Sequence, residues 1–223
     1  MKSRAWASLL IIGLALSTAA QNWRDQQRVT EDSRVSIDEP LYLTSGEALK
    51  RASIGFDGLL ADIYWIRTIL YFGGNLERQK ETTGVVDLRE LRQLKPLLEI
   101  TTELNPNHIA AYRFGAFFLQ YIDTEKAINF AKAGIRNNPD VWRLYQDLGF
   151  IYWRADRYRE ASEAYLAGSR VAGAPAWMEA MAATMLARGG EGETARELFR
   201  RLCDGSEDQF IRQFCEGPVV GSR

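Results

Sequence analysis

His108, Cys203 and Cys215 are the chain's only histidine and cysteines, the residue types that most often bind transition metals or act as nucleophiles. Their spacing fits no metal site built from His and Cys ligands. His108 comes directly after Asn105-Pro106-Asn107, where a helix is expected to begin. A general base needs a positioned partner, and the spacing names none. We therefore expect His108 to be a structural or surface residue.

No other motif indicates catalysis or a cofactor. Gly189-Gly190 precedes Glu191 and predicts a turn between helices rather than a phosphate-binding loop. Carboxylates are scattered among arginines, as at Arg159-Glu160, which is typical of a solvated face. The chain carries 28 Lys+Arg against 29 Asp+Glu, so its net charge of -1 gives no electrostatic argument for nucleic acid. We expect no enzyme, no cofactor, no metal and no nucleic-acid partner.

The N-terminus combines a basic start with an apolar run. Lys2 and Arg4 precede residues 5–20, which carry no charge. Trp6 and Trp23 bracket this run, and their separation corresponds to roughly 25 Å of helix, near the thickness of a bilayer's hydrocarbon layer. Tryptophan prefers the membrane interface. We expect residues 1–23 to form an uncleaved membrane anchor that contacts the lipid bilayer through residues 5–20.

The alternative is a cleaved secretory signal, because small residues precede possible cleavage sites after Ala19 or Ala20. Both interpretations place the rest of the chain on the periplasmic or extracytoplasmic side, since the positive residues stay in the cytoplasm. In an exported domain, two and only two cysteines suggest a disulfide between Cys203 and Cys215. Closing this loop of about 13 residues would stabilise the fold by roughly 3 kcal/mol. Two buried free thiols are the other possibility.

A polar linker and a first group of helices are predicted next. Residues 24–43 are mixed in charge, and Pro40 excludes a helix there, so we expect an extended linker. Thr44 to Glu47 has the T-x-x-E form of a capping box, which predicts a helix start. Apolar residues at helical spacing predict a second helix from Asp57 to about residue 72, ended by Gly73-Gly74.

Residues 75–86 are predicted to be a polar loop and residues 87–104 a further helix, bent or restarted at Pro96. We expect residues 44–106 to form a degenerate N-terminal helical repeat with this loop inserted. Ala61 and Tyr64 support that interpretation, because they keep a spacing of three between a small residue and an aromatic that recurs later in the chain.

A spacing of 34 residues organises the remaining sequence. Its clearest unit is 142–175, with small residues at Gly149 and Ala161 and aromatics at Tyr152 and Tyr165. The equivalent residues are Gly115, Phe118, Ala127 and Ala131 in the preceding unit, and Ala183, Leu186, Ala195 and Phe199 in the following one.

This pattern resembles the tetratricopeptide repeat (TPR) family, in which each unit is two antiparallel helices. It departs from the family at Ala131, where a large residue is usual, and at Leu186, where an aromatic is usual. The resemblance implies an all-α fold: a right-handed α-solenoid of three to four TPR helix pairs. The three clear units fall at about 108–141, 142–175 and 176–209, within residues 107–209, and a cap and tail follow at 210–223.

The resemblance also implies a partner-binding groove, lined by Tyr112, Leu119, Arg143, Phe150, Trp153, Arg154, Trp177 and Arg188. Aromatics beside arginines are typical of interaction hot spots. Alternatively, Phe150 and Trp153 contact a neighbouring helix or the N-terminal segment. Some TPR domains hold a terminal carboxylate with a clamp of basic residues and Asn. Here Tyr112 and Ala116 occupy two of its positions, so that ligand is not expected.

We therefore expect a non-catalytic scaffold or accessory subunit that binds other proteins, most naturally subunits of a membrane-associated complex. The alternative is a cleaved, soluble periplasmic TPR module that binds peptides or cell-envelope components. The N-terminal residue of the mature protein distinguishes the two.

Overall fold

The computed structural model describes residues 46–205 together with Ile211 and Cys215. These residues belong to one compact unit, Leu43–Arg223. The described part of the chain is helical and contains no strand, which confirms the expected all-α class. None of its helices is long and apolar enough to cross a membrane. The predicted anchor, the linker and most of the predicted cap and tail lie outside the described residues.

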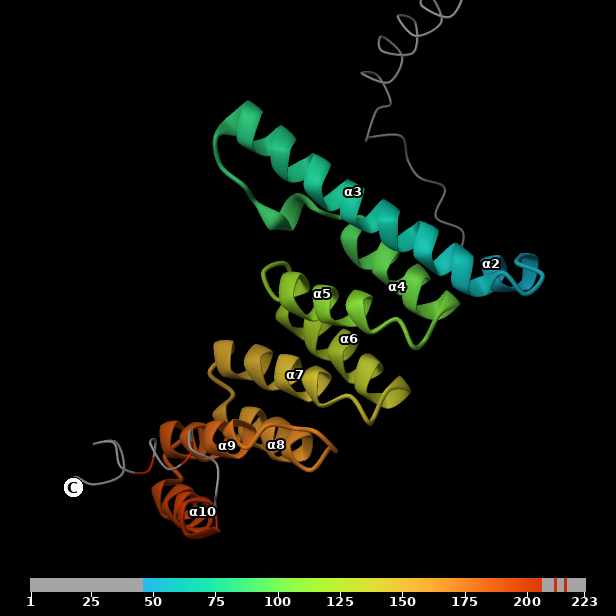
Figure 1. The fold of residues 1–223 in the computed structure, drawn as a ribbon. Helices are drawn as coiled ribbons and strands as arrows, with labels where there is room; N and C mark the ends of the chain where they lie inside the picture. Colours follow the sequence, from blue (N-terminus) through green and yellow to red (C-terminus); the bar gives the residue numbers. More distant parts are fainter. Residues whose placement is uncertain (1–45, 206–210, 212–214, 216–223) are drawn as a thin grey trace, which may run out of the picture. The chain divides into compact units, whose positions relative to one another are not determined.

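The helices pack in the order of the chain. The α-helices are α2 (Gly46–Ala52), α3 (Asp57–Thr83), α4 (Leu94–Leu104), α5 (Ile109–Leu119), α6 (Thr124–Asn137), α7 (Trp142–Arg154), α8 (Tyr158–Ser169), α9 (Trp177–Arg188) and α10 (Gly192–Gly205). From α3 to α10 each helix packs on the next, and α5 also packs on α7. Each range 108–141, 142–175 and 176–209 therefore contains two helices joined by a short turn (Figure 1).

α3 is longer than the sequence predicts. It continues through Gly73-Gly74 to Thr83, and Gly84 ends it in the left-handed conformation with a φ of 70°. The predicted loop at residues 75–86 is therefore wrong for most of its length. Each glycine costs about 1 kcal/mol relative to alanine inside a helix. That cost is offset by contacts beyond the glycines.

Hydrogen bonds fix the second half of α3. The Asn75 amide donates to the Tyr71 carbonyl oxygen at 2.7 Å. The Gln79 side chain donates to the Asp87 carbonyl oxygen at 3.2 Å and accepts the Asp87 N–H at 2.6 Å. Gln79 thereby ties the helix to the segment that returns towards α4.

A 3-10 helix, η1 (Leu88–Glu90), and α4 replace the single helix predicted for 87–104. Asp87 caps η1 by accepting the Arg89 N–H at 2.9 Å. Pro96 lies in the first turn of α4, where the missing proline N–H costs no helical hydrogen bond. The chain thus restarts a helix close to Pro96, as predicted.

Aromatic side chains join α3 to α5. The ring centroids of Trp65 and Phe72 lie 5.4 and 5.1 Å from that of Phe114. Phe72 also lies 4.3 Å from Phe118. This face of α3 packs against a core that continues from Leu91 through to Phe199. The face of α3 that makes these contacts is therefore covered by the fold.

Small residues set the approach between paired helices. A Cβ atom on Gly149 of α7 would lie 2.8–2.9 Å from three atoms of the Tyr165 ring on α8. In the preceding pair, Gly115 meets the ring of Phe130 instead. Phe130 thus supplies the large side chain that the 34-residue spacing assigned to the position of Ala131.

We expect Gly149→Ala to lower the free energy of unfolding by about 1–3 kcal/mol, because the new methyl group overpacks the Tyr165 ring. Gly73→Ala is the matched control. Gly73 also lies inside a helix, but its Cβ would meet nothing within 4 Å. That change should raise stability by up to about 1 kcal/mol. Urea denaturation followed by circular dichroism measures both, and equal effects would contradict this account of the α7–α8 contact.

Tyr165 should also make stability fall at alkaline pH. Burial, with a smaller contribution from the Asp147 carboxylate, raises the pKa of Tyr165 to about 12. The unfolded chain loses this proton near pH 10. Stability contributed by the neutral phenol is therefore complete below pH 10 and is lost as pH rises towards 12. Tyr165→Phe should give a shallower decline in unfolding free energy between pH 9 and 12. Identical slopes would contradict the assignment.

Candidate functional site

Two arginines, 34 residues apart, each stack on an aromatic ring of the preceding helix pair. The Arg154 guanidinium lies 4.9 Å from the centroid of Tyr121, and the Arg188 guanidinium lies 5.6 Å from the centroid of Trp153. Arg154 ends α7 and Arg188 ends α9, while Tyr121 lies just beyond the end of α5. The two arginines occupy equivalent positions of the 34-residue spacing and each makes a cation–π contact, although the rings that they contact are 32 residues apart.

Two further rings extend this surface. Phe150 packs edge-on against Trp153 at 5.8 Å, and Phe117 against Tyr121 at 6.1 Å. Phe117 is 48% exposed and Tyr121 40% exposed. We call the set the aromatic–arginine ridge; it comprises Phe117, Tyr121, Phe150, Trp153, Arg154 and Arg188.

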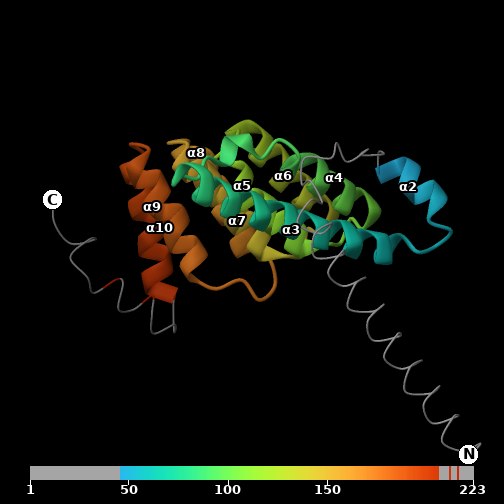
Figure 2. The same ribbon diagram turned by 90° about the horizontal axis from the view of Figure 1, so that it is seen from above.

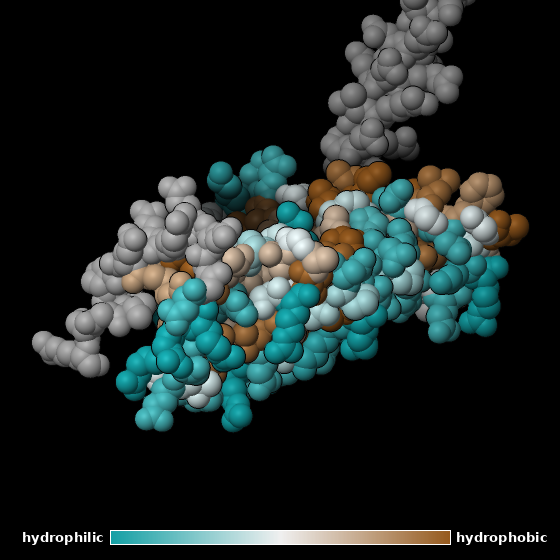
Figure 3. Space-filling view, turned by 60° about the horizontal axis from the view of Figure 1, so that its bottom comes forward, coloured by the Kyte–Doolittle hydropathy of each residue, from teal (hydrophilic) through white to brown (hydrophobic). Residues whose placement is uncertain are grey.

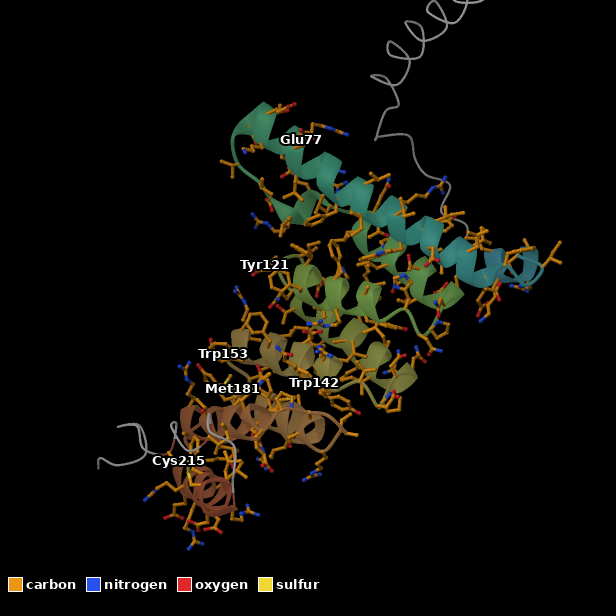
Figure 4. All side chains as sticks on the ribbon, viewed as in Figure 1. Glu77, Tyr121, Trp142, Trp153, Met181 and Cys215 are labelled. Atoms are coloured by element: carbon orange, nitrogen blue, oxygen red, sulfur yellow. A yellow bond between two sulfur atoms is a disulfide. The ribbon has the colours of Figure 1, made fainter. Side chains whose placement is uncertain are left out.

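Figure 4 shows Tyr121 and Trp153 at the same edge of the helices, whereas Trp142 lies away from that edge. Partly exposed aromatics beside exposed arginines are the composition of an interaction hot spot. The ridge contains four of the eight residues expected in the groove. Sequence reasoning missed Phe117 and Tyr121, although a search for aromatics at the end of each first helix would have found Tyr121.

Two more of the expected residues, Arg143 and Trp177, lie at the beginnings of α7 and α9. Trp142 and Trp177 pack edge-on with centroids 6.1 Å apart. The exposed Arg143 lies over Trp142 at 4.5 Å. These residues form a second, smaller aromatic cluster and do not join the ridge, because they occupy the opposite ends of the same helices.

Tyr112 and Leu119 lie in the core. They are 2% and 1% exposed. The Tyr112 ring packs 5.2 Å from Phe130, and its hydroxyl accepts a hydrogen bond from the Asn137 amide at 2.7 Å. The face of α5 that carries these two residues is covered by its own helix pair.

An ion pair ties α5 to α7. Arg113 Nε donates to Asp147 Oδ2 at 2.8 Å, and the two residues are 34 apart. Burial raises the pKa of Asp147 above its ordinary value, while the hydrogen bond from Arg113 opposes that shift. The pair connects successive first helices and so helps to bring the ends of α5 and α7 into line.

His108 caps α5. Its Nδ1 accepts the Ala111 N–H at 3.2 Å. Its Nε2 lies 3.7 Å from Asp62 Oδ1, and its ring packs 5.3 Å from Trp65. One ring nitrogen is thus used by the backbone, and the other faces a carboxylate on α3. Within the part of the chain that the structure describes, no three His, Cys, Asp or Glu side chains are grouped to hold a metal ion.

A groove between α4 and α6 has no counterpart in the sequence analysis. It comprises two adjoining hollows of about 600 and 400 Å3, both lined by Lys95 and Lys126. Lys95 forms an ion pair with Glu99, and Lys126 lies 3.1 Å from Asp123. Because both shared lysines already face carboxylates, the groove shows no preference for an anion, and we assign it no ligand.

Cys203 and Cys215 form a disulfide, with Cα atoms 6.0 Å apart. Beside it, Ile211 is fully buried against Ala180 and Leu202. The covalent link therefore closes α10 onto the segment that carries Ile211, at the end of the described chain.

We expect Cys203→Ser and Cys215→Ser each to lower the free energy of unfolding by roughly 3 kcal/mol, because the loop is no longer closed in the unfolded chain. The double variant should match either single variant, since both remove the same bond. Mass spectrometry should find no alkylated cysteine before reduction and two after it. Two cysteines alkylated without reductant would contradict the bridge.

Neither the protein-family models nor the curated proteins contain a match to this chain. The function is therefore argued from the surfaces described above.

Proposed function

We propose that this protein is a non-catalytic scaffold or accessory subunit of a membrane-associated complex, and that it binds partner proteins on the aromatic–arginine ridge. The observation that carries the proposal is the repeated stacking of Arg154 on Tyr121 and of Arg188 on Trp153. A surface that repeats with the helix pairs suits an extended protein partner better than a small molecule.

The composition of the ridge supports this role. Tryptophan, tyrosine and arginine dominate the binding energy of protein interfaces, because each combines a large rigid area with hydrogen-bonding groups. Stacking also holds each guanidinium in place, so less side-chain entropy is lost on binding. A partner segment that presents apolar side chains beside a carboxylate would complement both features.

We further infer that α5 to α10 are three TPR units, that α3 and α4 are a fourth, and that together they build a right-handed α-solenoid. Residues related by the 34-residue spacing support this inference. Arg154 and Arg188 each contact an aromatic ring, and Gly115 and Gly149 each face a ring on the following helix. The Arg113–Asp147 ion pair joins two such equivalent positions. A helix pair cannot bury its apolar face alone, so such units require neighbours.

The proposed location is extracytoplasmic, with residues 1–23 as a membrane anchor. The disulfide between Cys203 and Cys215 supports it, because disulfides persist in oxidising compartments and are rare in the cytosol. The basic residues Lys2 and Arg4 before the apolar run support an orientation with the folded unit outside.

Co-purification from detergent-solubilised membranes tests the interaction. The wild-type chain and the variant Trp153→Ala/Arg154→Ala are compared by quantitative mass spectrometry. We expect the same partner proteins to be enriched with wild type and to fall at least tenfold with the variant, since losing one hot-spot residue costs about 2 kcal/mol. Arg159→Ala is the control, because Arg159 is exposed on α8 and lies outside the ridge. Equal recovery of partners with both variants would contradict the assignment.

The N-terminal residue of the mature protein tests the attachment separately. A chain that retains residues 1–20 and sediments with membranes is the expected result. A chain that begins at Ala20 or Gln21 and is released by osmotic shock would replace the anchored scaffold with a soluble periplasmic module.

A further inference from the structure

α3 exposes a row of large apolar side chains. Phe56, just before the helix, and Leu59, Ile63, Ile66 and Leu70 are 64%, 58%, 41%, 57% and 67% exposed. We call these five residues the α3 stripe. Single exposed apolar residues are ordinary, whereas a contiguous row marks an interaction surface. Figure 2 looks down on α3, and no other described helix lies over it. Figure 3 shows exposed hydrophobic groups along the upper edge of the face that it draws.

The spacing of the α3 stripe is that of a coiled-coil seam. Successive members are separated by three, four, three and four residues. Phe56, Ile63 and Leu70 therefore occupy heptad position a, and Leu59 and Ile66 occupy position d. Ile69, 38% exposed at position g, borders this seam. A seam with spacings of three and four residues is the pattern that one further helix covers.

The fold already uses the opposite side of α3. Ala61 and Thr68 occupy heptad position f and are both 0% exposed, and Tyr64 is 7% exposed. The stripe is consequently not required for packing inside this unit. Two heptads are too short to form an isolated coiled coil. In the folded chain α3 is already helical. Pairing two such helices therefore costs less conformational entropy than pairing two unfolded segments.

The charges beside the stripe favour one orientation of a second α3 helix packed against it. Asp62 occupies position g and Arg67 position e, five residues later. In a parallel helix pair, position g of one chain faces the following position e of the other. Asp62 would then face Arg67 of a second copy, and the twofold symmetry forms the pair twice. An antiparallel pair sets g against g and e against e, so it does not join these charges.

Both charged groups are accessible for this contact. The Asp62 side chain is 68% exposed, although one of its oxygens lies 3.7 Å from His108. Arg67 is exposed, with its guanidinium 5.3 Å from the Tyr64 ring. A lipid surface fits the stripe less well, because a helix lying on an anionic bilayer carries basic residues along its flanks. The flanks here offer one acid, Asp62, and one base, Arg67, beside the apolar residues Leu60 and Ile69.

We propose that the α3 stripe is a self-association surface through which two copies of this chain pair with their α3 helices parallel. The pairing is isologous, so each copy contributes the same five apolar residues and the same two charges. It also places Asp57, the first residue of α3, of both copies at the same end of the helix pair. The pairing does not rest on the proposed membrane attachment.

Charge exchange on the full-length chain in detergent is the decisive test, with mass measured by sedimentation equilibrium. We expect wild type to be a dimer. Asp62→Arg and Arg67→Asp should each raise the dissociation constant at least tenfold, because each places like charges face to face. The double variant Asp62→Arg/Arg67→Asp should return the constant to within about threefold of wild type, since the opposite charges meet again. Circular dichroism verifies that all variants remain folded.

Disulfide cross-linking in native membranes gives an independent measurement without detergent. Ile66→Cys should form a covalent dimer under mild oxidation, because a parallel pair brings each d residue next to its own copy. Leu59→Cys should behave likewise. Thr82→Cys is the control, since Thr82 is exposed on α3 beyond the stripe and at position f. The native cysteines are already joined to each other within the chain.

A monomeric mass at all concentrations, no rescue by the double charge exchange, or equal cross-linking of Ile66→Cys and Thr82→Cys would each overturn the proposal. So would a monomer that binds vesicles of phosphatidylglycerol and phosphatidylcholine through the stripe, which would assign the surface to lipid. None of these outcomes affects partner recovery on the ridge, so failure here is distinguishable from failure of the proposed function.

Discussion

The close contact between a glycine and an aromatic ring in the pairs α5–α6 and α7–α8 is the constraint on which the other features depend. Gly149 admits Tyr165, and Gly115 admits Phe130, to distances that no side chain at the glycine would allow. This contact fixes how far apart the paired helices lie. With that distance set, and with Arg113 bound to Asp147 between α5 and α7, the ends of the first helices come into line. The stacks of arginine on aromatic rings require that alignment.

The sequence was most informative where structure depends on local spacing. The 34-residue period predicts the ranges that each contain two helices, and Gly189-Gly190 predicts the turn between α9 and α10. The sequence was least informative where residues on other segments determine whether a helix continues or a side chain is buried. Two glycines in succession ordinarily end a helix, yet α3 continues because Gln79 is held by Asp87, eight residues away. Tyr112 was expected in a groove, but the Phe130 ring and Asn137 amide that bury it are specified by another helix.

Apolar periodicity indicates that a helix face is hydrophobic, and it leaves open what covers that face. In α3 the apolar residues occupy two opposite sides. Ala61 and Thr68 face the core, while Leu59 and Ile66 face outward. Apolar residues at helical spacing predict the helix correctly, but they do not tell which of its two sides is buried. Both sets repeat at spacings of three and four residues, so only their burial in the folded chain separates them.

The ridge and the stripe belong to different helices, and this separation gives the proposed pairing a consequence for binding. The ridge is built from α5, α7 and α9, whereas the stripe is confined to α3 and the residue before it. In two paired copies, both ridges would therefore remain exposed and able to bind a partner. A partner with two matching segments would bind the second ridge as an intramolecular step, at an effective concentration set by the span between them. Modest affinity at each ridge would then suffice to hold a complex at the membrane.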